Sequence, residues 1–592
     1  MQSKTSCFNR AVFRKTLSRC WPLWAGAAII LFFWLPFVLA NVSTQPVAGE
    51  PADVVIPDTI LHATQSLPLL VCLFGLCFAA ATFDYLFSRP STGMMASLPL
   101  KREGLFCSSF AAGLVMLLSV GLLTAALTAI ITLTKGAQDL SAVWTWLGVW
   151  SMEAVTFYAI GVFCAMLTGQ VLVLIPLYAL VNFGGVFLCG ILNYMARMLL
   201  IGVPTEKSFG AFAWLEFLSP CEKLLVDTGV DYQLLASRAS VVGVFSGWPV
   251  VIGYFLVGLV LAALALVLFK RRKMEYAQEP ATGKALGQTL KYIVTFYCAL
   301  GFPAFLELFF GGGIAASTAG LLLFTALGAG IGYLISEMIL HKSVRVLRSS
   351  WKGLLITAAA ALLVVGAMKL DVFGYVHRVP DAGDIVSAEL RTYHLKTELT
   401  DSDDLKDLTD LHRDLIEVQP DGVYRAQELV ITYTLKNGKT LSRAYAVNST
   451  LATESLKSRV RELFDRADTV NSNHDPYHEL TEDVIEWAQV EWTEPADGEA
   501  GETDAYTGTF TTYELERTDA LALFENGIQP DIEAGVFPNW DGSENELPSA
   551  PCVVIQLQWP EEGTQALNYF ITPDCVNTLA WLAAHGYEIP GV

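Results

Sequence analysis

Nine long apolar runs in the first 370 residues constrain this chain more than any other feature of its sequence. A helix needs about 20 predominantly apolar residues to cross the hydrocarbon core of a bilayer. Backbone polar groups in lipid must be satisfied within the segment, so such runs form helices. We therefore expect a polytopic all-α membrane protein with about nine transmembrane helices. The expected spans are 21–40, 67–87, 105–133, 143–167, 171–195, 248–269, 293–310, 314–340 and 354–368.

The charge balance changes at Leu370, close to the end of the last apolar run. Residues 1–370 hold 16 acidic and 24 basic residues, whereas residues 371–592 hold 42 acidic and 14 basic ones. A hydrophobic fraction of 53% over 592 residues excludes an ordinary soluble enzyme. We expect a membrane region followed by an acidic, water-soluble domain at residues 371–592.

Basic residues predict which side of the membrane each loop occupies. With the N-terminus inside, 18 Lys and Arg residues fall on cytoplasmic segments and six on outer ones. Cytoplasmic loops carry an excess of Lys and Arg, so this distribution favours that orientation. An odd number of spans then makes the C-terminal domain extracytoplasmic.

The basic segment 1–20, followed by the apolar run Trp21–Ala40, resembles the start of a secretory signal peptide. The run is long enough to span the bilayer, and no tidy small-residue cleavage site follows it. We therefore interpret the run as a retained first span. Residues 1–20 then form a cytoplasmic basic N-terminal segment.

Alternating apolar and polar residues predict an α+β fold for the outer domain. Residues 429–435 and 441–447 alternate on either side of the tight-turn pair Asn437-Gly438, which predicts a hairpin. Residues 552–557 and 566–571 predict a second hairpin.

Helices are expected between and after these hairpins. The segment 402–418 places Leu405, Leu408, Leu411 and Leu415 on one face. A second helix is expected at 453–464, and a third has Thr572 as N-cap, Pro573 in its first position and Gly586 beyond its end. Hairpin followed by helix thus occurs twice, a pattern that favours internal duplication.

Two glycine motifs have both a nucleotide-binding and a structural interpretation. Gly438-Lys439-Thr440 matches the end of a phosphate-binding loop, but the glycine required five residues earlier is Tyr433, and the site is a hairpin turn. Gly328, Gly330 and Gly332 lie within an expected span, where small residues allow close helix packing. We therefore expect no ATP-binding site, cofactor or catalytic residue in this chain.

Histidine and cysteine pairs of the outer domain raise the question of a metal site or a disulfide. His474 and His478 have a spacing that suits zinc, but Pro476 interrupts the helix and no further ligand is evident, so we expect no metal. For Cys552 and Cys575, a disulfide and two thiols are equally compatible with the sequence. Seven of the eleven cysteines lie in or beside apolar spans, where they are most simply small apolar residues.

Two polar residues lie well inside expected spans. Glu153 lies in the middle of the span 143–167, and Asn182 lies in the span 171–195. Polar groups in the bilayer are costly, so these two either line a translocation pathway or bond neighbouring helices. Both interpretations stay open. Glu307 and Glu337 lie near span ends, where we expect them to reach the interface.

The charged loop Asp84–Phe106 joins two spans and is predicted to be cytoplasmic. Pro90 and Pro99 bracket a segment too short to cross the membrane, with Ser91 as a candidate N-cap. We expect a short helix here. An ordinary interfacial turn is the alternative interpretation.

Five residues of this loop form a candidate contact surface. They are the apolar Met94, Met95 and Leu98 and the basic Lys101 and Arg102. Flexible apolar side chains adapt to the groove of a partner protein. The loop is therefore suited to dock on another protein.

The segment Ser97-Leu98-Pro99-Leu100-Lys101-Arg102 resembles the loop that precedes the third span in ABC-2-type transporter permeases. Residues 332–353 and 373–385 resemble a Gram-positive bacterial subgroup of these permeases that carries a C-terminal extracytoplasmic domain. The resemblance implies that residues 21–269 form a six-helix permease core and residues 270–370 three further transmembrane helices. It also implies that the loop couples the chain to a separate cytoplasmic ABC ATPase subunit.

The resemblance further implies how such a chain acts. It would work in the lipids of the cell membrane as a homodimer, or as a heterodimer with a second permease, and would export a substrate without binding nucleic acid. The sequence does not identify that substrate. The alternative from another class is a membrane-anchored sensor or scaffold whose outer domain binds a ligand or partner.

The orientation can be tested with compartment-specific reporters fused after Thr134, Lys284 and Val592. We expect outside, inside and outside, respectively, because these positions are separated by odd numbers of spans. The measurement is reporter activity in intact cells. A cytoplasmic signal at Val592 would show that the spans are miscounted, with 354–368 the weakest because it is the shortest.

Overall fold

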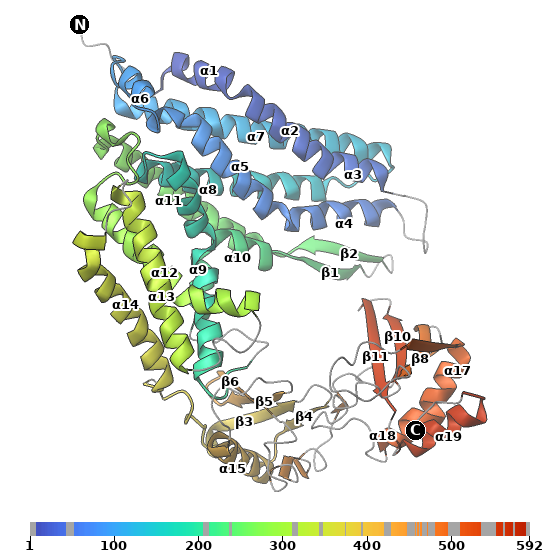
Figure 1. Cartoon of the computed structure of the whole chain (residues 1–592). Coiled ribbons are helices and arrows are strands. Elements are labelled where there is room, and N and C mark those ends of the chain that lie inside the picture. The colour runs from blue at the N-terminus through green and yellow to red at the C-terminus, as the bar shows by residue number, and fades with distance from the viewer. Residues whose placement is uncertain are drawn as a thin grey trace. The chain divides into compact units, whose positions relative to one another are not determined.

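The computed structural model divides the chain into two compact units (Figure 1). Unit 1 comprises Met1–Tyr194 and Gly210–Val364, and unit 2 comprises Met195–Phe209 and Val365–Val592. The structure describes residues 8–42, 52–204, 212–235, 240–310, 318–341, 347–372, 374–391, 395–418, 428–446, 456, 459–460, 462–463, 470–471, 480–482, 484–494, 509–533, 552–559, 563–571, 573 and 575–587.

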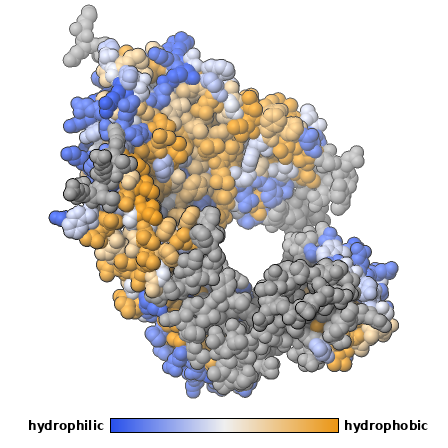
Figure 2. Space-filling view, in the orientation of Figure 1, coloured by the Kyte–Doolittle hydropathy of each residue, from blue (hydrophilic) through white to orange (hydrophobic). Residues whose placement is uncertain are grey.

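Eight helices among the described residues are long and apolar enough to cross a membrane. Their apolar side chains cover much of the visible surface of unit 1, and polar side chains gather at the end that carries α6 (Figure 2). The helices are α2 (Trp21–Trp34) with α3 (Pro36–Asn41), α7 (Arg102–Thr134), α8 (Ser141–Leu167), α9 (Val171–Leu199), α11 (Trp248–Arg271), α12 (Lys284–Phe310), α13 (Thr318–His341) and α14 (Leu347–Lys369). A multi-pass membrane protein is the class that these helices fit.

The remaining expected span is a bent pair of helices. Helices α4 (Ala52–Gln65) and α5 (Leu67–Thr82) meet at an angle of 49°, and together they bring the number of candidate spans to nine. Pro68 lies in the first turn of α5, where its fixed backbone angle starts a new helix. The span expected at 67–87 is therefore shorter at its end and preceded by a second helical segment.

Short elements connect the long helices. They are α1 (Arg10–Arg19), η1 (Asp84–Leu86), α6 (Arg89–Ala96), η2 (Ala213–Leu218), α10 (Pro220–Val226), η3 (Met274–Tyr276) and the hairpin of β1 (Val230–Leu235) and β2 (Ser240–Phe245). The expected cap Ser91 is wrong, because α6 begins at Arg89 and the residue in the N-cap position is Ser88. Pro90 then occupies the first turn, where a missing N–H is tolerated.

Helix α8 is the central helix of unit 1. The most apolar 18-residue window of α8 is 78% buried, whereas the corresponding windows of the other seven helices are 22–39% buried. Glycines on neighbouring helices allow this close approach: a Cβ on Gly75 of α5 would lie 2.7 Å from the carbonyl carbon of Phe157, and one on Gly121 of α7 would lie 2.1 Å from Nε1 of Trp150. Helix α8 thus packs closely at these glycines, with the backbone of Phe157 against Gly75 and the side chain of Trp150 against Gly121.

Unit 2 contains two antiparallel sheets and their helices. The first sheet has the order β6-β5-β3-β4-β7 and the second the order β11-β10-β8-β9. The elements are η4 (Ala382–Asp384), β3 (Ile385–Arg391), β4 (Leu395–Leu399), α15 (Ser402–Val418), β5 (Glu428–Leu435), β6 (Thr440–Ala446), β7 (Val470–Asn471), β8 (Ile485–Glu494), β9 (Thr509–Leu515), α17 (Arg517–Leu523), η6 (Phe524–Ile528), α18 (Gln529–Glu533), β10 (Cys552–Trp559), β11 (Gly563–Phe570) and α19 (Val576–Ala584).

The two sheets share one connectivity. In each, a hairpin is followed by helical residues and a second hairpin, and the first strands of the two hairpins pair with each other, β3 with β5 and β8 with β10. The four strands therefore stand in the same order in both sheets. This agrees with the internal duplication that the sequence pattern favours.

Most elements predicted for this domain are present. Helix α15 has the predicted bounds, both hairpins form, and Gly438 adopts a φ of +76° in the turn between β5 and β6. Of the helix expected at 453–464, the structure describes five residues, and these are helical. The expected start of the last helix is wrong: α19 begins at Val576, and Cys575, rather than Thr572, is in the N-cap position.

Asp531 of α18 determines where α19 begins. Its carboxylate, which is buried, accepts hydrogen bonds from the backbone N–H groups of Asn577 and Thr578 at 3.0 and 2.8 Å. The side chains of both residues donate to it as well, at 2.7 and 2.6 Å. A carboxylate at a helix N-terminus satisfies N–H groups that have no partner within the helix.

The segment that follows α9 is part of the first sheet's surroundings. The carbonyl of Gly202 accepts hydrogen bonds from the N–H of Ala444 in β6 at 3.2 Å and from the hydroxyl of Tyr375 at 3.3 Å. Arg443, which is buried, stacks on the Tyr375 ring at 3.8 Å. Ile201 packs against the core of the first sheet as well, so the segment just after α9 contributes to this half of unit 2.

His412 is enclosed between α15 and the first sheet. Its ring nitrogens lie 3.0 Å from the hydroxyl of Tyr433 and 2.6 Å from that of Tyr445. Burial, together with the nearby Arg443 and Arg413, lowers the pKa of His412 to about 3. The folded domain therefore holds a neutral imidazole over the physiological pH range.

The stability of this sheet should fall as the pH falls below about 6.5, the ordinary pKa of histidine. The unfolded chain then binds a proton at His412 that the folded chain excludes, which removes up to about 1.4 kcal/mol per pH unit until the folded pKa is reached. The measurement is hydrogen-exchange protection factors of β5 and β6 in the full chain between pH 7.5 and 5. In His412→Gln this pH dependence should be weaker, and an unchanged slope would contradict the assignment.

Candidate functional site

Three loops that the charge rule places on the cytoplasmic side meet at one end of unit 1. They are residues 84–101, 168–170 and 272–283. The N–H of Gly169 donates to the carbonyl of Glu279, and the N–H of Gln278 donates to the carbonyl of Gly169, both at 2.9 Å. A Cβ on Gly169 would lie 1.9 Å from the carbonyl oxygen of Tyr276, so only glycine permits this approach. We call these three loops the platform.

The buried guanidinium of Arg272 joins the platform to the central helix. It donates to the carbonyls of Ala165 and Met166 at the end of α8, at 2.7 and 3.2 Å, and to that of Leu86 at 3.4 Å. A cation at a helix C-terminus interacts favourably with the exposed carbonyls and the helix dipole. Burial lowers the pKa of Arg272 to about 10, which leaves the group charged at neutral pH.

Helix α6 lies within the first of these loops and is fixed to the third loop and to the residues just before it. Arg89 forms an ion pair with Glu279 at 3.3 Å, and the hydroxyl of the buried Thr92 donates to the carbonyls of Tyr85 and Ser88 at 2.5 and 2.8 Å. The predicted short helix therefore exists. Contacts of its side chains with Glu279 and with the residues just before the helix set its position.

The five residues predicted to form the contact surface have different positions. Met94 and Leu98 are 52% and 39% exposed, and Lys101 is also exposed. Met95 is half-buried against the core of unit 1. Arg102 donates to the carbonyls of Lys270 and Arg272 at 2.9 and 2.7 Å, so it holds the platform together. The exposed apolar patch thus consists of Met94 and Leu98.

Glu153 and Asn182 are both buried inside unit 1. Glu153 lies on α8 and is 1% exposed, and neither carboxylate oxygen has a hydrogen-bond partner among the residues that the structure describes. Asn182 lies on α9 and donates to the carbonyl of Tyr178 at 2.9 Å. The two side chains are not hydrogen-bonded to each other. A buried carboxyl without a described partner is costly and therefore a candidate for function.

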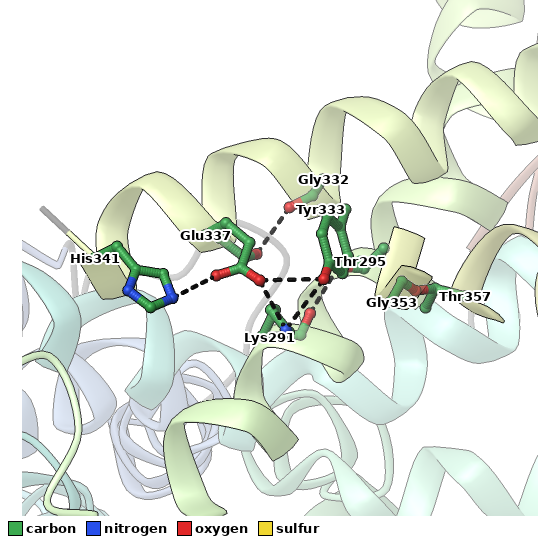
Figure 3. A network of polar contacts seen from close by, with 9 residues as sticks. Lys291, Thr295, Gly332, Tyr333, Glu337, His341, Gly353 and Thr357 are labelled. Atoms are coloured by element: carbon green, nitrogen blue, oxygen red, sulfur yellow. Dashed lines mark hydrogen bonds and ion pairs between the residues drawn. The ribbon is translucent and has the colours of Figure 1, made fainter. Parts of the chain in front are cut away.

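A buried polar network between α12 and α13 is absent from the sequence expectations (Figure 3). Lys291 and Glu337 form an ion pair at 3.0 Å, with each side chain 3% exposed. The hydroxyl of Tyr333 lies 3.3 Å from Lys291 Nζ and donates to Glu337 Oε1 at 3.1 Å. His341 Nε2 lies 3.0 Å from the other carboxylate oxygen of Glu337. The expectation that Glu337 reaches the interface is therefore wrong.

The position of Lys291 explains why the sequence did not show this network. The apolar run begins at Ile293, so hydropathy alone places Lys291 in the preceding loop. Helix α12 begins at Lys284, so Lys291 lies two turns inside it. The glycines of α13 contribute as predicted, since a Cβ on Gly328 or Gly332 would lie 2.5 Å from atoms of Cys298 on α12.

An apolar cavity of about 500 Å³ lies beside this network, between α9, α12 and α13. Leu177, Phe183, Leu290 and Ile339 are among its lining residues, and Lys291 reaches it with part of its side chain. A cavity of this size and lining suits the apolar part of a ligand.

The remaining predicted sites are not brought into a functional cluster. Cys552 and Cys575 are both buried, and the sequence's two alternatives for them, a disulfide and two thiols, stay open. His474 and His478 lie outside the described residues, and the described part of the chain contains no group of three His, Cys, Asp or Glu residues that could hold a metal ion. The side chain of Glu307 is not described either.

The chain matches no protein-family model, no curated protein and no solved structure.

The buried ion pair predicts a large difference between two otherwise similar substitutions. Lys291→Met should destabilise the full chain by about 3 to 5 kcal/mol, because it leaves Glu337 buried with its main counterion removed. Lys270→Met breaks a pair with Glu103 of 2.6 Å in which both side chains are more than 40% exposed, and should lower stability by about 0 to 1 kcal/mol.

The measurement is the unfolding of the full chain in detergent, with Lys291→Met combined with Glu337→Leu as a further variant. The double substitution should recover most of the loss, because it removes both charges together. Equal effects of Lys291→Met and Lys270→Met would contradict the role of burial.

Proposed function

We propose that this chain is the membrane-spanning subunit of a transporter that is powered by a separate cytoplasmic ATPase, as its resemblance to ABC-2-type permeases implies. It acts as a dimer, and it moves its substrate outward across the cell membrane. The observation that carries the proposal is the exposed pair Met94, on the short helix α6, and Leu98, just beyond its end, in a loop that is fixed to its neighbours.

The platform supplies a path along which a movement of α6 reaches the central helix. Residue Leu86, which precedes α6, and the end of α8 are bound by the same Arg272 guanidinium. Displacement of α6 would strain these hydrogen bonds and favour a different position of α8. Since α8 carries Glu153, the same movement would alter the surroundings of the buried carboxyl.

Glu153 and Asn182 are the candidate residues of the translocation pathway. Each carries a buried oxygen without a described hydrogen-bond partner, a state that a polar substrate group or an entering water molecule would relieve. The apolar cavity between α9, α12 and α13 suits an amphipathic substrate.

A sensor or scaffold is the second candidate, and one observation favours it. The segment that follows α9 is bonded through Gly202 to β6 and Tyr375 of the outer domain. A ligand bound to that sheet could therefore act directly on the end of a membrane helix. In this function no ATPase would be required.

Met94→Glu should weaken the association with the ATPase tenfold or more. Burial of an apolar side chain contributes on the order of 1 to 3 kcal/mol, and a charge in the same contact adds a penalty. Lys101→Gln, at the rim of the same surface, should change the affinity by less than about fivefold, because exposed ion pairs contribute roughly 0 to 1 kcal/mol. The measurement is co-purification of the ATPase from native membranes.

Met95→Glu is a poorer probe, because Met95 packs against the core of unit 1 and its replacement also affects folding. If no ATPase accompanies the wild-type chain, or if Met94→Glu retains it in full while folding normally, the transporter proposal is wrong. The first of these outcomes would favour the sensor.

A further inference from the structure

Two cysteines that are far apart in the sequence meet inside unit 1. Cys72 lies on α5 and is 5% exposed, and Cys221 lies on α10 and is fully buried. The two thiols lie close enough to influence each other electrostatically. Cys221 Sγ also lies 3.7 Å from the carbonyl oxygen of Pro68, one helical turn before Cys72 on α5. The contact is therefore between two defined elements.

The surrounding residues hold both cysteines in place. The hydroxyl of Tyr178 on α9 donates to the carbonyl of Cys72 at 2.8 Å. Ser219, directly before α10, accepts a hydrogen bond from the N–H of Val186 on α9 at 2.8 Å. Both thiols are thus fixed relative to α9 by bonds that do not involve sulfur.

The contact also lies where a disulfide can persist. The charge rule places the start of α5 and the whole segment between α9 and α11 on the outer side of the membrane. Disulfides form and persist in extracytoplasmic compartments, whereas cytosolic thiols stay reduced. Since α10 is short and joined to its neighbours by loops, a covalent bond to α5 would restrict its movement more than any other contact it makes.

We propose that Cys72 and Cys221 form a disulfide that fastens α10 to the outer end of α5. This inference does not depend on the proposed transport function, although it does depend on the predicted orientation. The bond would fix the short helix α10 to α5. Oxidation and reduction would then alter how freely α10 moves relative to α5.

The reaction is thiol–disulfide exchange with an extracytoplasmic disulfide as the oxidant. One cysteine attacks that disulfide as the thiolate, forms a mixed disulfide and releases one thiol. The second cysteine then attacks the mixed disulfide, forms the Cys72–Cys221 bond and releases the second thiol. The two cysteines lose two electrons and two protons, and the oxidant gains both.

The test uses the full chain in its native membranes. The membranes are dissolved in a denaturant that contains N-ethylmaleimide, which blocks buried thiols as soon as they are exposed. The protein is then digested without reductant, and mass spectrometry is used to search for a peptide that joins Cys72 to Cys221. A second sample is first treated with diamide, which accepts two electrons and two protons. Cys77→Ser is the matched control, because Cys77 lies on the same helix and is only half-buried.

We expect the joined peptide in the wild type and in Cys77→Ser, and its absence in Cys72→Ser and Cys221→Ser. Reduction of the wild type should lower its unfolding temperature by roughly 5 °C, whereas Cys221→Ser should not respond to reductant. The proposal is overturned if Cys72 and Cys221 are both recovered with N-ethylmaleimide after diamide treatment. It is also overturned if the peptide forms only after the protein is unfolded in detergent. This outcome is measured on the wild type, so it does not depend on whether a variant folds.

Discussion

The burial of one cation, Arg272, is the interaction on which the organisation of unit 1 depends. Its guanidinium saturates backbone carbonyls at the end of α8 and at Leu86, and it does so where three loops meet. A buried charge without such partners would cost several kcal/mol, so the loops cannot separate while the residue stays in place. The exposed patch of Met94, on α6, and Leu98, just after it, is consequently presented on a defined surface rather than on a free loop.

Two buried acidic residues of unit 1, Glu337 and Glu153, differ in the partners that surround their carboxyl groups. Glu337 is surrounded by Lys291, Tyr333 and His341, so its burial is compensated and its network holds α12 to α13. Glu153, on the most buried helix, has no hydrogen-bond partner among the described residues. A buried acid with several partners is typical of a residue that stabilises helix packing. A buried acid without a described partner is typical of a residue with a functional role.

The sequence predicted what depends on local pattern and missed what depends on helix length and tertiary contacts. The apolar runs located the eight candidate spans, and period-two alternation located both hairpins. Lys291 was missed because polar residues extend α12 two turns beyond its apolar run. Likewise, α19 begins at Val576 because Asp531, more than 40 residues away, supplies its capping oxygens. No local signal encodes that bond.

The two halves of unit 2 are not equivalent. The two sheets have the same strand order, yet only the first core includes a residue from the segment that follows α9, Ile201. Because Gly202 is bonded to β6 and Tyr375 beside it, a change in the first sheet acts on that segment directly. The described residues of the second core belong instead to its own strands and helices, and to the short segments that adjoin them. The first sheet is therefore the half of unit 2 through which either proposed function would act on the segment that continues α9.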